Sequence, residues 1–377
     1  MRMKIWILNL FVAVAFLNLH SCGESGPDLK LPGAGDPDIR SIITGVASRE
    51  GIVGMGAGII DTSAETAIAV CGYRRAGSGQ PAGLADLWHI GSCAKSMTAT
   101  LAAGLVEEGK LSWGSALAEI FPEMRKELGP VKGGINLEQL LSHRSGLPYN
   151  PEPDLIGMLF RSNREQREGA LRKVPDVQLE SQPGAEYHYS NYGYTLAGVM
   201  IERVEGGSFE DIIRAELFGP LGMESPQFEL EIDFGKEGVL WGHDNDGRPV
   251  QRWKRPVNDR PAIYPAGGIR CSLQDWAVFI RQHLEGGRRG TDYLSRETFR
   301  ELHRSRGDGY ALGWSIRERE WGGGKVLQHS GSNGWNYSVV WVAPERGLAV
   351  FVCANQGGCY EELDEVAGRL IEMINEK

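Results

Sequence analysis

The sequence predicts an α+β fold in which one antiparallel sheet is built from both ends of the chain, with terminal helices on it and an all-helical lobe inserted between. Short apolar runs joined by turn residues gather at residues 53–72 and 310–353, whereas the stretch between them is patterned mainly for helices. Strands joined by hairpins are antiparallel, and helices segregated from a sheet are typical of α+β proteins. A chain of 377 residues exceeds the usual size of one core, so two lobes are expected.

The N-terminal elements follow from apolar spacing. Residues 37–49 carry three isoleucines and a valine on one face, which predicts an amphipathic helix. Apolar runs at 53–60 and 66–72 follow, and the turn residues 61–64 between them predict a β-hairpin.

The remaining elements complete the two lobes. Helical patterns begin at Ser92 and recur at 137–142, 154–160, 194–204, 209–217 and 273–284. Strands are expected at 310–317, 325–329, 337–342 and 348–353, and a closing helix at 361–374. The predicted sheet lobe therefore covers about residues 37–91 and 305–377, and the helical lobe about 92–304.

A single S-x-x-K, Ser92 to Lys95, stands where a strand-like segment runs into an Ala-rich helix. Residues three apart share a helix face, so the Lys95 amine can reach the Ser92 hydroxyl. An ordinary lysine pKa of about 10.4 leaves almost no neutral amine at pH 7, and lowering it to about 8 requires about 3 kcal/mol. The helix dipole supplies only part of that, so desolvation or a further polar group must add the rest.

The further polar groups are predicted at the only Y-x-N, Tyr189-Ser190-Asn191. A phenol and a carboxamide two residues apart on a turn can both point into one cleft, where Tyr189 would shuttle a proton and Asn191 would orient Lys95. Taken alone this motif is weak, since a tyrosine-rich turn usually serves packing.

A third motif, His329-Ser330-Gly331, opens into a glycine-rich loop that contains Ser332 and Trp335. His329, Gly331 and Ser332 are candidate substrate-binding residues on the edge of a strand, and Asn191 is a further candidate. Trp335 is a candidate apolar wall for an acyl chain, or equally a loop tryptophan that caps the core.

The three motifs, in this order, resemble the serine β-lactamase and penicillin-binding-protein-like superfamily, specifically the class C β-lactamase and esterase branch. Segments 140–148 and 265–269 also resemble that branch, and the similarity runs from about residue 37 to the C-terminus. The resemblance implies a serine hydrolase in which Ser92 is acylated and Lys95 and Tyr189 form the base pair. It also implies an oxyanion hole made by the backbone N–H groups of Ser92 and Ser332.

His329 departs from the family pattern, which usually has a lysine at this position. A histidine with a pKa of about 6.5 is only about a quarter charged at pH 7, so the permanent cation for a substrate carboxylate is weakened. This favours an esterase, or an amidase or peptidase without an obligatory substrate carboxylate. The alternatives are a true β-lactamase or D,D-peptidase, and a catalytically silent cell-envelope binding protein; His329 serving only to shape the strand is the structural alternative.

Other chemistries have little support. Cys93 points about 100° away from Ser92 on a helix and is interpreted as structural. No G-x-S-x-G elbow accompanies His143, so a Ser-His-Asp hydrolase is disfavoured and His143 is interpreted as a turn-stabilising donor. The chain contains no H-E-x-x-H and no C-x-x-C, so neither a metal nor a cofactor is expected. Its formal net charge of −9 disfavours nucleic-acid binding.

The N-terminus predicts export from a bacterial cell. A basic start precedes an apolar stretch at residues 5–19, which is too short to span a bilayer comfortably. The stretch ends in a segment resembling a lipobox, so residues 1–22 are interpreted as a signal peptide with Cys22 as the lipidated residue and residues 23–36 as a linker. Ordinary cleavage nearby and an uncleaved anchor remain alternatives. The expected protein is a cell-envelope enzyme, membrane-bound through lipid, with a small-molecule or peptide substrate and an unknown oligomeric state.

Overall fold

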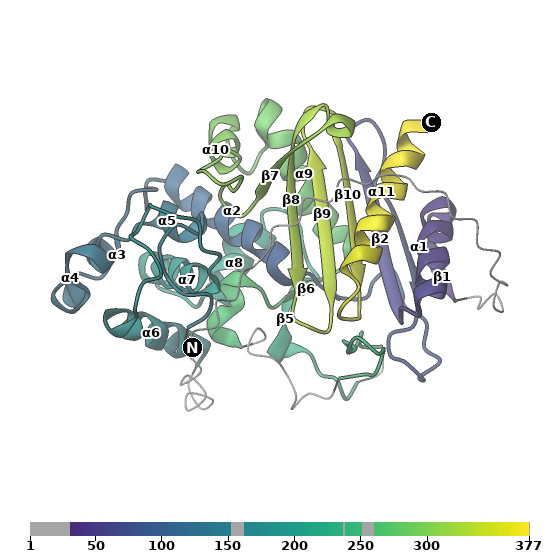
Figure 1. The fold of residues 1–377 in the computed structure, drawn as a ribbon, viewed down its shortest axis with the longest axis horizontal. Helices are drawn as coiled ribbons and strands as arrows, with labels where there is room; N and C mark the ends of the chain where they lie inside the picture. The colour runs from purple at the N-terminus through teal and green to yellow at the C-terminus, as the bar shows by residue number, and fades with distance from the viewer. Residues whose placement is uncertain (1–30, 152–161, 237, 251–259, 377) are drawn as a thin grey trace, which may run out of the picture.

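The computed structural model describes residues 31–151, 162–236, 238–250 and 260–376. A seven-stranded sheet occupies one half of this part of the chain (Figure 1). The strands, in spatial order, are β1 (Gly33–Gly35), β3 (Ala67–Gly72), β2 (Gly54–Asp61), β10 (Leu348–Ala354), β9 (Tyr337–Ala343), β8 (Gly324–Ser332) and β7 (Ser315–Arg319). Every neighbouring pair is antiparallel. The two chain ends join where β2 pairs with β10, which confirms the predicted fold class.

Two terminal helices, α1 (Pro37–Glu50) and α11 (Tyr360–Glu376), cover the outer face of the sheet (Figure 1). Helix α1 begins because the Asp36 side chain accepts hydrogen bonds from two first-turn amides, and it ends at Gly51 in the left-handed conformation. The predicted apolar face is buried, with Ile39, Ile43 and Val46 fully inaccessible to solvent. This apolar layer fixes both chain ends on the same side of the sheet.

The opposite face of the sheet packs against the helical half. Helix α9 (Leu273–Arg289) crosses it, and the Trp276 and Phe351 ring centroids lie 5.2 Å apart. Helix α2 (Ala94–Glu107) is buried along most of its length. The other helices of this half are α3 (Leu117–Ile120), α4 (Arg125–Gly133), α5 (Leu137–Leu141), α6 (Asn163–Lys173), α7 (Asn191–Glu205), α8 (Phe209–Ile213) and α10 (Arg296–Leu302).

A buried ion cluster holds several of these helices together. The Arg167 guanidinium on α6 donates to Glu202 on α7 and to Glu210 on α8, and all three side chains are at least nine-tenths buried. Arg167 also donates to the carbonyl of Pro261, the first residue of the 3-10 segment η9 (Pro261–Ala266). The cluster thus fixes η9, which borders the site, to three helices.

Some predicted boundaries were wrong. The predicted linker 23–36 includes β1, whose glycines allow close approach: a Cβ on Gly33 would lie 2.6 Å from the carbonyl oxygen of Val70. The helix predicted at 194–204 begins at Asn191, because the Ser190 side chain caps it. Residues 310–314, predicted as strand, form a tight turn in which the Ala311 N–H donates to the Trp314 carbonyl.

The pairing of a second, small sheet was not predicted, and some predictions fall outside the described residues. The strand-like segment before Ser92 forms β4 (Trp88–His89), which pairs with β6 (Ile269–Cys271), and β6 pairs with β5 (Gln227–Phe228). The predicted helix 154–160 lies outside the described residues, as do the predicted signal peptide and Cys22. Within the described ranges, no helix combines the length and the apolar character needed to cross a membrane. The five described cysteines are all free thiols.

Candidate active site

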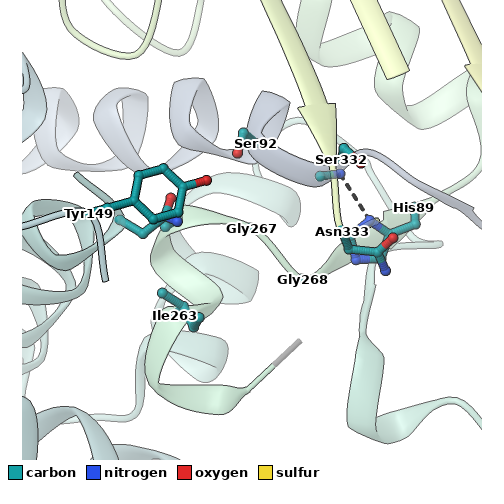
Figure 2. A pocket seen from close by; sticks show the side chains of 11 residues that line it. His89, Ser92, Tyr149, Ile263, Gly267, Gly268, Ser332 and Asn333 are labelled. Atoms are coloured by element: carbon teal, nitrogen blue, oxygen red, sulfur yellow. Dashed lines mark hydrogen bonds between the residues drawn. The ribbon is translucent and has the colours of Figure 1, made fainter. Parts of the chain in front are cut away.

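Ser92 lies on a 3-10 turn, η1 (Gly91–Cys93), that leads directly into α2. Figure 2 shows its side chain at the start of the helix, at the edge of a cleft. Gly91 adopts a φ of +51°, which turns the chain sharply after Ile90. Cys93 faces the other way, with its sulfur 3.4 Å from the Ser338 hydroxyl, and burial raises the pKa of the thiol to about 12. The hydroxyl, and not the thiol, is therefore presented to the cleft.

The amine of Lys95 is buried beneath Ser92. Its Nζ lies 3.1 Å from Ser92 Oγ, 2.7 Å from Asn191 Oδ1 and 2.7 Å from the carbonyl oxygen of Ala266. Burial lowers the pKa of Lys95 well below its ordinary value. A neutral amine has two N–H groups, which suit the Asn191 and Ala266 oxygens, and one lone pair, which then faces the Ser92 hydroxyl. This arrangement can accept the hydroxyl proton.

Tyr189 and Asn191 approach the same two groups. The Tyr189 hydroxyl is hydrogen-bonded to Ser92, but burial raises the pKa of the phenol well above its ordinary value, so the phenol is protonated. Its ring lies close to Lys95, with Nζ 4.8 Å from the ring centroid. The amide of Asn191 is oriented by Asn150, whose Oδ1 accepts from Asn191 Nδ2 at 2.9 Å. Ser92, Lys95, Tyr189 and Asn191 are thus brought together.

The end of β8 places a second backbone amide beside Ser92. A Cβ added to Gly91 would lie 2.4 Å from the Ser332 amide nitrogen, and one added to Gly331 would lie 2.7 Å from the Ser92 amide nitrogen. Only glycine at both positions permits so close an approach between η1 and β8. Figure 2 shows Ser332 at the end of its strand, beside the cleft. The backbone amides of two segments packed this closely are candidates for an oxyanion hole.

His329 is buried behind these groups. Its Nε2 lies 3.1 Å from the Tyr310 hydroxyl, and its Nδ1 lies 2.8 Å from the Ser330 carbonyl oxygen. Nδ1 therefore carries the proton, and Nε2 accepts from Tyr310. Burial, together with the nearby Lys95, lowers the pKa of His329 to about 3. The imidazole is neutral at pH 7, so it supplies no cation.

The described lining of the cleft contains no lysine, arginine, aspartate or glutamate. It consists of His89, Gly91, Ser92, Tyr149, Asn191, Ile263, Ala266, Gly267, Gly268, Ser332 and Asn333. Trp335 does not belong to this lining; its carbonyl instead accepts from the His243 amide. Tyr149 supplies the aromatic surface, since it is 51% exposed and stacks on Tyr189 with ring centroids 5.8 Å apart.

Several of these residues were not predicted from the sequence. Ala266 belongs to a flanking segment that carried the resemblance, but nothing in its type indicated that its carbonyl would bind Lys95. Tyr149 and Tyr310 carry no motif, and the latter lay in a predicted strand. The described residues contain no group of three or more histidine, cysteine, aspartate or glutamate side chains placed to hold a metal.

A buried amine in contact with a serine hydroxyl, at the junction of a sheet and a helical half, is the arrangement expected of a serine acyl-transfer site. The family model described as Beta-lactamase matches residues 39–371, and the chain belongs to that family. It is a serine hydrolase.

Named relatives agree with this assignment. "Penicillin-binding protein 4" of Amycolatopsis lactamdurans is 26% identical over 305 residues, covering 76% of this chain and 76% of the relative. A "Putative D-alanyl-D-alanine carboxypeptidase" of Escherichia coli O157:H7 is 26% identical over 284 residues, covering 67% of this chain and 64% of the relative. "Unguisins hydrolase ungD'" of Aspergillus campestris is 25% identical over 293 residues, covering 71% of this chain and 52% of the relative. The chain thus spans between about half and three quarters of these proteins.

Solved structures share the fold. The octameric penicillin-binding protein homologue from Pyrococcus abyssi superposes with a TM-score of 0.73 at 27% identity, covering 90% of this chain and 77% of that chain. A class C β-lactamase from Rhodobacter sphaeroides gives a TM-score of 0.72 at 19% identity, covering 91% and 100%. The mixed sheet and helical architecture is therefore that of β-lactamases and penicillin-binding proteins.

Proposed function

We propose that this protein hydrolyses neutral esters, or amides and peptides that lack an obligatory carboxylate, through an acyl-enzyme on Ser92. Lys95, as a neutral amine, accepts the Ser92 proton while the oxygen attacks the substrate carbonyl. The Ser92 and Ser332 amides bind the oxyanion. The Tyr189 phenol donates its own proton to the leaving group and takes up the proton that Lys95 received from Ser92. Water, activated by the same groups, then releases the acyl product.

The preference for neutral substrates is inferred from the neutral state of His329. Relatives with a lysine at this position would have a permanent cation for a substrate carboxylate, whereas here an uncharged imidazole donates to a backbone carbonyl. The described cleft lining is likewise uncharged. A carboxylate would therefore lose its hydration without gaining an ionic partner, so neutral substrates are favoured. The proposed substrate contacts are Gly331, Ser332, Asn191, Asn333 and Tyr149. Trp335 is not included, because it does not line the described cleft.

A direct comparison of two chromogenic substrates tests this proposal. Turnover of a short p-nitrophenyl ester should exceed that of nitrocefin, because nitrocefin carries a carboxylate. Both activities should disappear in Ser92→Ala, which removes the nucleophile. Faster turnover of nitrocefin would contradict the role given to His329 and would favour a β-lactamase or D,D-peptidase, as the names of the bacterial relatives suggest.

A fluorophosphonate probe separates an active hydrolase from a catalytically silent binding protein. The probe should label Ser92 in the wild-type protein and not in Ser92→Ala. Absence of labelling in the wild type, with the fold intact by circular dichroism, would contradict an acyl-enzyme altogether.

We also propose an exported, lipid-anchored cell-envelope location, supported by the signal-like segment that precedes Cys22. In a bacterial host the wild-type chain should sediment with membranes, and Cys22→Ala should not.

A further inference from the structure

His143 occupies a strained backbone position directly behind the reactive groups. It lies just beyond Ser142, which ends α5, and adopts a φ of 61°. Among the described residues that are not glycine, it shares a positive φ only with Asp308. Glycine is the usual residue at this point of a helix end, since it adopts the conformation without strain. A histidine here indicates that the imidazole serves a purpose beyond ending the helix.

The imidazole holds the backbone of the Y-x-N turn. Its Nδ1 accepts from the Ser190 N–H at 3.0 Å, and the His143 carbonyl accepts from the His188 N–H at 2.8 Å. Ser190 lies between Tyr189, which contacts Ser92, and Asn191, which binds Lys95. Because His143 Nδ1 holds the Ser190 amide, it restricts the directions of the Tyr189 and Asn191 side chains on either side.

The ring face of His143 also limits the position of Tyr189. The centroids of the His143 and Tyr189 rings lie 4.2 Å apart, and the centroid of the Tyr310 ring lies 4.7 Å from that of His143. His143 is fully buried, and burial lowers its pKa well below the ordinary value, so the ring is neutral and Nδ1 stays free to accept. Accepting at Nδ1 leaves the proton on Nε2, which has no hydrogen-bond partner among the described residues. Packing alone would favour an apolar ring here, because an unpaired buried N–H is costly.

From these contacts we infer that His143 is a positioning residue, which fixes Tyr189 and Asn191 against Ser92 and Lys95 through the Ser190 amide. This corrects its sequence-based interpretation as a donor, because the side chain acts as an acceptor. The inference rests on the proposed acyl-enzyme chemistry of Ser92.

Two substitutions separate positioning from folding. Both Asn and Gly tolerate a positive φ, and both remove the imidazole ring, but only Asn keeps an oxygen acceptor close to the place of Nδ1. In His143→Gly, kcat for the p-nitrophenyl ester and the rate of fluorophosphonate labelling should each fall about tenfold relative to His143→Asn, the effect of one lost hydrogen bond. KM should change by less than about twofold, since His143 does not line the cleft. Thermal unfolding of both variants reports on folding separately.

The outcomes distinguish the possibilities. Equal kcat in the Asn and Gly variants, or losses that follow unfolding temperature in both, would overturn the inference and leave His143 a structural residue. If His143→Gly does not fold, ring-nitrogen NMR of the wild-type protein provides the test. The His143 signal is identified as the one that is absent in His143→Asn, and it should show a proton on Nε2 and none on Nδ1. The opposite tautomer would overturn the inference. A wild-type protein that is not labelled at Ser92 would instead contradict the proposed function.

Discussion

The protonation state of Lys95 sets the pH dependence of the reaction. The amine must be neutral to accept the Ser92 proton, and burial shifts its pKa well below 10.5. The value of kcat/KM should therefore rise with pH along an acid limb and reach its plateau well below pH 10.5. A pH series with the p-nitrophenyl ester measures this. Lys95→Met should lose about a thousandfold or more in kcat, with labelling by the fluorophosphonate slowed in parallel. An acid limb centred near pH 10 would show that the amine is charged at neutral pH and is not the base.

The contact between η1 and β8 sets the geometry of the proposed oxyanion hole. Gly91→Ala would bring a Cβ to 2.4 Å from the Ser332 amide nitrogen, and it would add strain at a φ of +51°. The strand must then move away from Ser92, so one oxyanion donor is lost and kcat should fall about a hundredfold to a thousandfold. Ester kinetics on the folded variant check this prediction.

Gly45→Ala is the matched control for Gly91→Ala. Gly45 lies in α1, and a Cβ there would meet nothing within 4 Å. The control should keep full activity and gain up to about 1 kcal/mol in the free energy of unfolding, because alanine favours helix. Equal kcat in Gly91→Ala and wild type would mean that Ser332 does not supply the second donor.

Local signals in the sequence were sufficient for some of the regular elements and for the contact between Ser92 and Lys95. Helix α1 followed from apolar spacing, and the Ser92–Lys95 pair followed from an i,i+3 relation along one turn. Those features depend only on residues close in sequence. The edge strand β1 could not be recognised, because its three residues are Gly, Ala and Gly and carry no apolar alternation.

Long-range contacts explain what the sequence could not predict. Tyr310 reaches His329 through a turn that replaced a predicted strand, and Ala266 contributes only a carbonyl, which every residue possesses. For Trp335, a place in the cleft wall and a core-capping role were both open; it is not part of the described cleft lining, and its backbone pairs with the His243 segment. Adjacency in sequence did not ensure adjacency in space, and Tyr149 supplies the aromatic surface instead.

The buried histidines couple the stability of the fold to pH. Six of the eight histidines in the sequence are buried in the described part of the chain: His89, His143, His243, His283, His303 and His329. His283 Nε2 is hydrogen-bonded to the Thr100 hydroxyl on α2 at 3.0 Å, and His283 Nδ1 to His303 Nε2 at 2.9 Å, in a setting that includes the Trp314 ring. Burial lowers the pKa of His143, His243, His283, His303 and His329, for His283 and His329 to about 3.

A lowered folded-state pKa means that the unfolded chain binds these protons first. As pH falls below about 6.5, the unfolded histidines become charged while the folded ones stay neutral, so each lowers the free energy of unfolding by up to about 1.4 kcal/mol per pH unit. The loss continues toward pH 3, where the folded groups begin to titrate. Urea unfolding at pH 7.5, 6.5, 5.5 and 4.5 should show the midpoint falling below about pH 6.5, above the range near pH 4 where carboxylates protonate. His283→Gln should make the dependence of the urea midpoint on pH shallower, since it removes one titrating group. A midpoint that is constant from pH 7.5 to 5 would mean that these histidines already carry a proton in the folded protein.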